Sequence, residues 1–166
     1  MQLRCALGGW GPKQYAVGMD GAKGQPAAEY VEIDHPWFSN EMMPIYRWTF
    51  PSEATDEELR ASIRAREDWA IRARYAMAWV IDLSNVTKAP ATQRKALAEH
   101  LKRFGELSAR WYAGSSLIVP SPWLRGVVTA VTWLSPPKFP YQLFSKPIEA
   151  ERWAREQLAG KLAGLD

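Results

Sequence analysis

The stretch Tyr75–Leu97, YAMAWVIDLSNVTKAPATQRKAL, decides the fold because it joins a buried strand to a helix. Its first part, Tyr75–Leu83, is almost wholly apolar and has the length of one strand, which predicts a central strand covered on both faces. Beyond it, Leu97, Leu101 and Phe104 recur at helical spacing and predict a long helix. A strand followed by a helix in this way indicates an α/β domain.

Four further segments have the pattern of strands. YVEIDHP (Tyr30–Pro36) and PIYRWTF (Pro44–Phe50) alternate apolar and polar residues, and a short turn segment separates them, so they predict a hairpin. SSLIVP (Ser115–Pro120) predicts a second buried strand, and YQLF (Tyr141–Phe144) predicts a short last strand. Together with the central strand they predict a sheet of four to five strands.

The helices between the strands carry their own start signals. Thr55 with Glu58 three residues later forms a capping box, and an apolar stripe at i, i+4 spacing follows it. Ser121 and Pro122 suit the cap and the first position of another helix, and Pro147 opens the last helix. The predicted order is therefore β-β-α-β-α-β-α-β-α, in a mixed sheet with parallel neighbours.

Residues 29–166 carry all of these elements and are predicted to form one domain. Residues 1–28 are rich in Gly, Ala and small polar residues, which predicts a flexible arm. Within this arm, Gln14–Val17 is a candidate short strand and Met19 a candidate natural start.

The composition excludes several classes of protein. Of the 166 residues 47% are apolar and 23% charged, as in a globular domain. Lys and Arg number 21 against 18 Asp and Glu, an excess that permits an acidic partner without requiring nucleic acid. There is one cysteine, Cys5, no apolar run of membrane-spanning length and no signal-peptide pattern, so we expect a cytoplasmic protein without an integral membrane segment.

Candidate catalytic groups are few. The histidines are His35, at a predicted strand end, and His100, within the long helix, and no nucleophile motif accompanies either. Glu32 and Asp34 share one face of a predicted strand, with His35 on the other, which is typical of a solvated face. Nothing near Cys5 would lower the pKa of its thiol. We therefore expect no enzyme activity, no catalytic residue, no bound metal and no cofactor.

Three phrases resemble a known family when taken in their order: WVIDLSNVT, SSLIVPSPWLRGVVTAVTWL and YQLFSKPIEAERWAREQL. They are similar to the STAS domain, in particular to the SpoIIAA-like, STAS/SEC14-type bacterial proteins, over roughly residues 29–158. The resemblance implies a STAS-like sheet with its helices packed mainly on one face. It also implies a signalling role of the anti-anti-sigma type, in which a partner kinase phosphorylates a Ser or Thr at the start of the helix after the central strand.

That phosphorylation motif is degenerate in this chain. The family's Asp-Ser-Ser-Gly type phrase falls on Pro90, Ala91, Thr92 and Gln93, so the usual Asp, acceptor and Gly are all replaced. Thr92 keeps a hydroxyl one place late, and Ser84 lies earlier in the loop. Both are candidate phosphorylation sites, because a phosphate at a helix N-terminus meets free backbone N–H groups.

The leading interpretation is a non-enzymatic, regulatory protein-interaction module. Its partner would be a protein, either acidic or a kinase-type regulator, and would bind the strand exit and helix start through Asn85, Lys88, Pro90, Ala91, Arg94 and Lys95. The basic residues around the long helix are interpreted as a solvated surface and not as a nucleic-acid site.

The alternative interpretation is small-molecule or lipid binding, which the SEC14-type kinship allows. The predicted apolar pocket would be lined by Trp123, Trp133, Phe139 and Tyr141.

Overall fold

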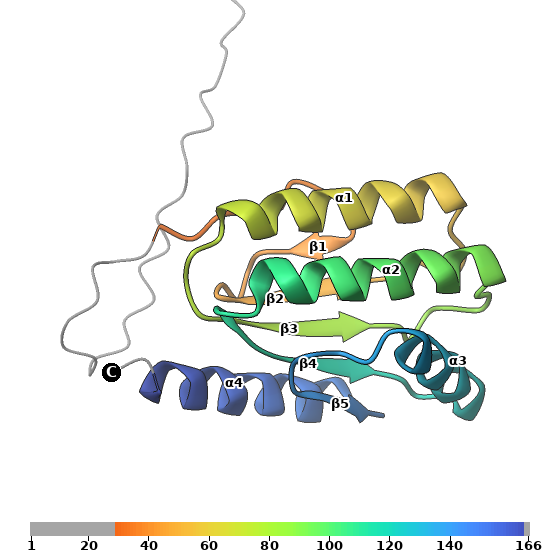
Figure 1. The fold of residues 1–166 in the computed structure, drawn as a ribbon. Coiled ribbons are helices and arrows are strands. Elements are labelled where there is room, and N and C mark those ends of the chain that lie inside the picture. Colours follow the sequence, from red (N-terminus) through yellow and green to blue (C-terminus); the bar gives the residue numbers. More distant parts are fainter. Residues whose placement is uncertain (1–28, 165–166) are drawn as a thin grey trace, which may run out of the picture.

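The computed structural model describes residues 29–164, which form a single α/β domain with a five-stranded mixed sheet and four helices (Figure 1). The predicted arm 1–28, with Cys5 and the candidate strand Gln14–Val17, lies outside the described residues. The strands are β1 (Phe38–Ser39), β2 (Ile45–Thr49), β3 (Met77–Asp82), β4 (Tyr112–Ile118) and β5 (Tyr141–Phe144). The helices are α1 (Asp56–Arg72), α2 (Ala91–Ser108), α3 (Pro122–Leu134) and α4 (Pro147–Ala163).

The sheet runs in chain order, β1-β2-β3-β4-β5, with β1 antiparallel to β2 and all other neighbours parallel. Crossovers between parallel strands nearly always have the same hand, so a sheet that grows in one direction places its connecting helices on one face. Helices α1, α2 and α3 are these connections, and α1 and α2 lie side by side (Figure 1). Helix α4 follows the last strand and packs on the opposite face, against β3 and β4. Packing mainly on one face is therefore as expected.

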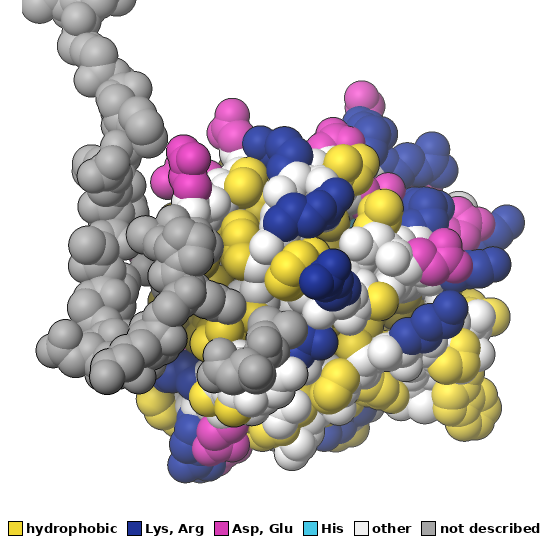
Figure 2. Space-filling view, turned by 60° about the vertical axis from the view of Figure 1, so that its left-hand side comes forward, with side chains coloured by type: hydrophobic (Ala, Val, Ile, Leu, Met, Phe, Trp, Pro, Cys, Tyr) yellow, Lys and Arg dark blue, Asp and Glu magenta, His cyan; other side chains and the backbone are white. Residues whose placement is uncertain are grey.

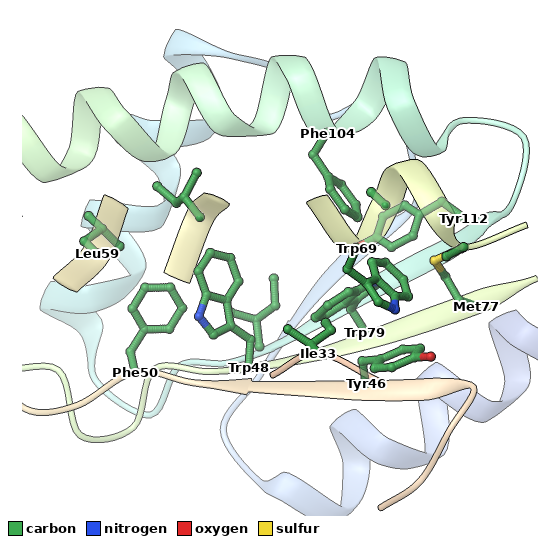
Figure 3. Packing of buried hydrophobic residues seen from close by; sticks show 14 residues of the cluster. Ile33, Tyr46, Trp48, Phe50, Leu59, Trp69, Met77, Trp79, Phe104 and Tyr112 are labelled. Atoms are coloured by element: carbon green, nitrogen blue, oxygen red, sulfur yellow. The ribbon is translucent and has the colours of Figure 1, made fainter. Parts of the chain in front are cut away.

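The face under α1 and α2 is packed with aromatic rings (Figure 3). Tyr46, Trp48 and Trp79 from the sheet are at most 1% exposed, and Trp69 from α1 and Phe104 from α2 are fully buried above them. The Tyr46 and Trp69 rings meet edge to face at 4.6 Å, a favourable geometry for aromatic pairs. These large rings keep the helices at a distance from the sheet and leave room for polar groups between them.

The face under α4 is built from alanines and aliphatic residues instead. Ala78, Ala150 and Ala154 are fully buried there, so the helix lies close to the strands. At Gly114 an added Cβ would lie 2.9 Å from the Pro140 carbonyl oxygen and 3.0 Å from the Trp153 ring. The two faces of one sheet thus differ in depth as well as in composition.

One predicted strand is wrong. Tyr30–Pro36 forms no strand, and the short β1 pairs with β2 in its place. The alternation was misleading because side chains satisfy this backbone: Val31 N–H donates to the Tyr75 hydroxyl at 2.9 Å, and the Val31 carbonyl accepts from Trp69 Nε1 at 2.7 Å. The Asn40 amide bonds both the N–H and the carbonyl of Ile33.

The other predicted elements are confirmed, with small shifts at their ends. β5 has the predicted bounds, whereas β4 begins at Tyr112, three residues before the predicted start. Both predicted caps are present: the Thr55 hydroxyl accepts from the Glu58 N–H, and Ser121 accepts from Leu124. Local start signals therefore located these helices to the residue.

Candidate binding sites: the strand exit, a basic groove and a cavity

The exit of β3 is held by Asp82. Its carboxylate accepts a hydrogen bond from the Ser84 backbone N–H at 3.0 Å and from Arg47 Nη1 at 3.4 Å. The loop then runs to Pro90, the N-cap of α2, which supplies no side-chain cap. Asn85, Pro90 and Ala91 are exposed there, as a contact surface requires.

Two of the three cations predicted for this surface are engaged by their own chain. Lys88 pairs with Glu53 at 2.8 Å, and Arg94 donates to the Ala89 carbonyl at 2.6 Å. Lys95 is exposed and has no ion pair or hydrogen bond to any described residue. Lys88 therefore faces a carboxylate of its own chain, whereas Arg94 keeps its charge beside a neutral carbonyl and Lys95 is free on the body of α2.

Both candidate phosphorylation sites are exposed. The Thr92 hydroxyl donates to the Asp56 carboxylate at 3.3 Å, so a phosphate on Thr92 would sit beside a negative charge on α1. Lys95, one turn further along α2, lies on the same side of the helix as Thr92. Ser84 lies in the loop, with its backbone tied to Asp82.

A groove of about 450 Å³ runs between α1 and α2 and contains Thr92 and Lys95. Its remaining charged residues are the cations Arg60, Arg64 and Arg103 and the acids Glu67 and Glu99. Glu67 is already bound to His100 and Arg103, so the groove carries a net positive charge. On the face drawn in Figure 2, Lys and Arg side chains are interspersed with hydrophobic and acidic ones.

A second, apolar cavity of about 80 Å³ lies between the sheet, α2, α3 and the loop before β5. Phe139 and Tyr141, two of the residues named in the alternative interpretation, line this cavity together with Leu117 from β4 and Val131 from α3. Trp123 and Trp133 do not; they project from α3 and are 51% and 82% exposed.

Arg66 from α1 lies in the wall of this cavity, and its side chain is 1% exposed. Its guanidinium carbon lies 3.8 Å from the centre of the Phe104 ring and 4.0 Å from that of Trp79, a cation–π arrangement. Nη2 donates to the Tyr112 hydroxyl at 3.2 Å, and Nε has no partner among the described residues. Burial lowers the pKa of Arg66 to about 10, so the guanidinium is still charged at neutral pH.

His100 connects this arginine to Glu67. Its Nδ1 lies 2.8 Å from the Glu67 carboxylate and its Nε2 lies 3.1 Å from Arg66 Nη1. Arginine can only donate, so Nε2 accepts and the proton is on Nδ1, in a neutral imidazole. Burial lowers the pKa of His100 to about 4, and the bond from His100 lowers the pKa of Glu67. Because Nε2 is directed at Arg66, this nitrogen is not placed to activate a hydroxyl.

Arg66 was missed in the sequence, although a signal exists. Leu59, Ile63, Arg66 and Ala70 follow i, i+4, i+7, i+11 spacing, so the arginine interrupts the apolar stripe of α1. A charged residue in such a stripe is rarely buried unless it has partners. His100 occupies the equivalent place on α2, and the two meet across the helix pair.

Comparisons with known proteins do not assign the chain to a family: no family model, no curated protein and no solved structure matches it. None of the helices within 29–164 is long and apolar enough to cross a bilayer. In the same part of the chain, no three His, Cys, Asp or Glu side chains cluster as metal ligands would.

Proposed function

We propose that the protein is a non-enzymatic regulatory module of STAS-like type that binds an acidic segment of a protein partner. The observation that carries the proposal is the groove between α1 and α2, which is lined by Arg60, Arg64, Lys95 and Arg103 as well as by Thr92. Electrostatic complementarity of this kind mainly increases association rate and specificity.

The proposed surface is wider than the strand exit alone. Arg60, Arg64 and Lys95 have no ion pair with any residue of 29–164, whereas Lys88 and Arg94 are engaged by their own chain. A carboxylate from a partner would therefore find free cations in the groove, and at the loop it would compete with Glu53 for Lys88. The loop residues Asn85 and Ala91 then serve as the edge of the contact.

Charge reversal tests this surface. The double variant Arg64→Glu with Lys95→Glu is expected to bind a fluorescein-labelled Glu-rich peptide at least about tenfold more weakly by fluorescence anisotropy. The matched control reverses Arg152 and Lys138, two exposed cations outside the groove, and should bind like the wild type. Wild-type binding should also weaken with added salt, because exposed charges are screened. Equal affinity of both double variants would refute the proposal.

A second function, apolar small-molecule binding, is favoured by the cavity that Phe139 and Tyr141 line. Ligand pockets are commonly lined by apolar side chains, and the surface of this cavity is almost wholly apolar. Native mass spectrometry of the protein purified without detergent tests it: a co-purifying small molecule is expected, and it should be absent from Val131→Phe, which fills the cavity.

A further inference from the structure

We propose that the outer face of α3 binds an anionic lipid surface, with the helix lying in the plane of the membrane interface. This inference concerns a surface separate from the groove and goes beyond the proposed function. Two features of the described residues carry it: an apolar helix face that no described element covers, and cations without acids in the chain around that face.

Helix α3 is apolar around most of its circumference. Leu124, Val128 and Val131 are buried on its inner side, and the helix packs against α2. Arg125 is the one charged residue of α3, and its Nη2 donates to the Ser145 hydroxyl at 3.0 Å. Helices that are apolar all round are normally covered on all sides. The outer side of α3 therefore has the composition of a covered surface.

This outer side carries apolar residues from one end of the helix to the other. Trp123, Val127, Ala130 and Leu134 follow i, i+4, i+7, i+11 spacing and form one stripe, and Trp133 lies beside it. Both tryptophans and Leu134 are exposed, and α3 lies at one end of the molecule, near the ends of β3 and β4 (Figure 1). Exposed apolar patches mark binding sites for proteins or membranes, and Trp and Leu are typical of helices that lie in a membrane interface.

The chain around this face has a positive charge. No Asp or Glu occurs between Glu106 and Glu149, a stretch that contains the whole of α3. The same stretch contains four cations: Arg110, Arg125, Lys138 and Lys146. Lys138, four residues beyond the end of α3, is exposed and has no ion pair with any residue of 29–164.

Helix α2 adds cations on the side that faces α3. The groove residues of α2, among them Ala96 and Arg103, lie on its flank toward α1. Arg94, Ala98 and Lys102 follow i, i+4, i+8 spacing on the other flank, and Lys102 is exposed there. An anionic lipid surface complements this combination of cations and exposed apolar side chains.

Other occupants of the face fit these observations less well. A two-fold contact between copies of the chain would bring the same rim of each copy together, so cations would meet cations. A protein partner would need a groove that matches a single convex helix, whereas a fluid bilayer can enclose it.

Vesicle sedimentation of the full chain tests the inference. The protein is expected to sediment with vesicles of phosphatidylcholine and phosphatidylserine, and at least about tenfold less with phosphatidylcholine alone. Trp133→Ser with Leu134→Ser should weaken binding to the mixed vesicles at least about tenfold. The matched control, Ile71→Ser with Leu162→Ser, removes two exposed apolar side chains of α1 and α4 and should bind like the wild type. No binding of the wild type to mixed vesicles, or equal binding by the two double variants, would overturn the inference.

Insertion of α3 has its own readout. Lipids with brominated acyl chains should quench part of the tryptophan fluorescence of the bound wild type. Trp123→Phe with Trp133→Phe should stay bound, because phenylalanine is also apolar, and should lose most of this quenching. Unchanged quenching in that variant would mean that α3 stays outside the bilayer, and the inference would be wrong.

Two other outcomes would assign the surfaces differently and overturn the inference. In the first, Arg64→Glu with Lys95→Glu abolishes vesicle binding while Trp133→Ser with Leu134→Ser keeps it, so the groove holds the vesicle. In the second, the wild type binds no vesicle and is a dimer by light scattering, and the Trp133 and Leu134 double variant is a monomer. A second copy would then cover α3.

Discussion

Acidification is expected to destabilise the protein through His100. The imidazole is 1% exposed and neutral, with Nδ1 donating to Glu67 and Nε2 accepting from Arg66. Protonation would add a hydrogen to Nε2, which lies 3.1 Å from Arg66 Nη1. The hydrogen bond between these two nitrogens would then be replaced by a contact between two positively charged donors.

The size of the effect follows from the pKa difference. His100 has a folded-state pKa of about 4 against 6.5 when unfolded. Because the folded pKa is depressed, the unfolded chain binds the proton more readily below pH 6.5, and stability falls as the pH falls toward 4. At about 1.4 kcal/mol per unit, the loss is about 3 kcal/mol in the free energy of unfolding. The lowered pKa of Glu67 acts in the same direction.

Urea denaturation followed by circular dichroism from pH 7 to pH 4 measures this loss. His100→Gln is the informative variant, because its amide can still donate to Glu67 and accept from Arg66 but does not titrate. The free energy of unfolding of the wild type, relative to that of His100→Gln, should fall by about 3 kcal/mol from pH 7 to pH 4. His35, whose pKa burial also lowers, is the control: His35→Gln should keep most of the wild-type slope. A constant gap between wild type and His100→Gln at every pH would refute the argument.

Three further predictions concern the fold and can be checked by thermal or urea denaturation. Thr55→Ala removes the capping box of α1 and should cost about 1 kcal/mol, whereas an unchanged midpoint would mean the cap contributes nothing. Gly114→Ala should cost about 1–3 kcal/mol, since its Cβ would press on Pro140 and Trp153. Gly126→Ala, within α3 and with no atom within 4 Å of the added Cβ, should instead stabilise by about 0.5–1 kcal/mol; a loss there would contradict the open space at this position.

Elements whose signals lie in neighbouring residues could be predicted from the sequence. The segment Tyr30–Pro36 could not, because contacts with distant residues determine its conformation. The capping box at Thr55, the Ser121 cap and the bounds of β5 all depend on residues close in sequence. Tyr30–Pro36 has an equally clear strand pattern, but its backbone is bonded by Tyr75 and Trp69, more than thirty positions away. An alternating pattern of apolar and polar residues indicates which side chains are buried. It does not indicate which groups form hydrogen bonds with the backbone.

The candidate sites also differ in how far the sequence could predict them. The strand exit could be located from sequence, because an apolar strand followed by a helix marks it. The groove could not, since it pairs Arg60 and Arg64 of α1 with Lys95 of α2 across the helix pair. Of the four residues named from the sequence for an apolar pocket, Phe139 and Tyr141 line the cavity, and the exposed Trp123 and Trp133 do not.

The sequence by itself determined the order of the elements, the class of the fold and the helix starts, because hydrophobic period and capping act over a few residues. Only the tertiary structure decided what Arg66 does. Its partners His100 and Tyr112 lie 34 and 46 positions away, and they meet it because the crossovers place α1 and α2 together over one aromatic face. The partners of a buried charged side chain are distant in sequence, so the local sequence pattern does not identify them.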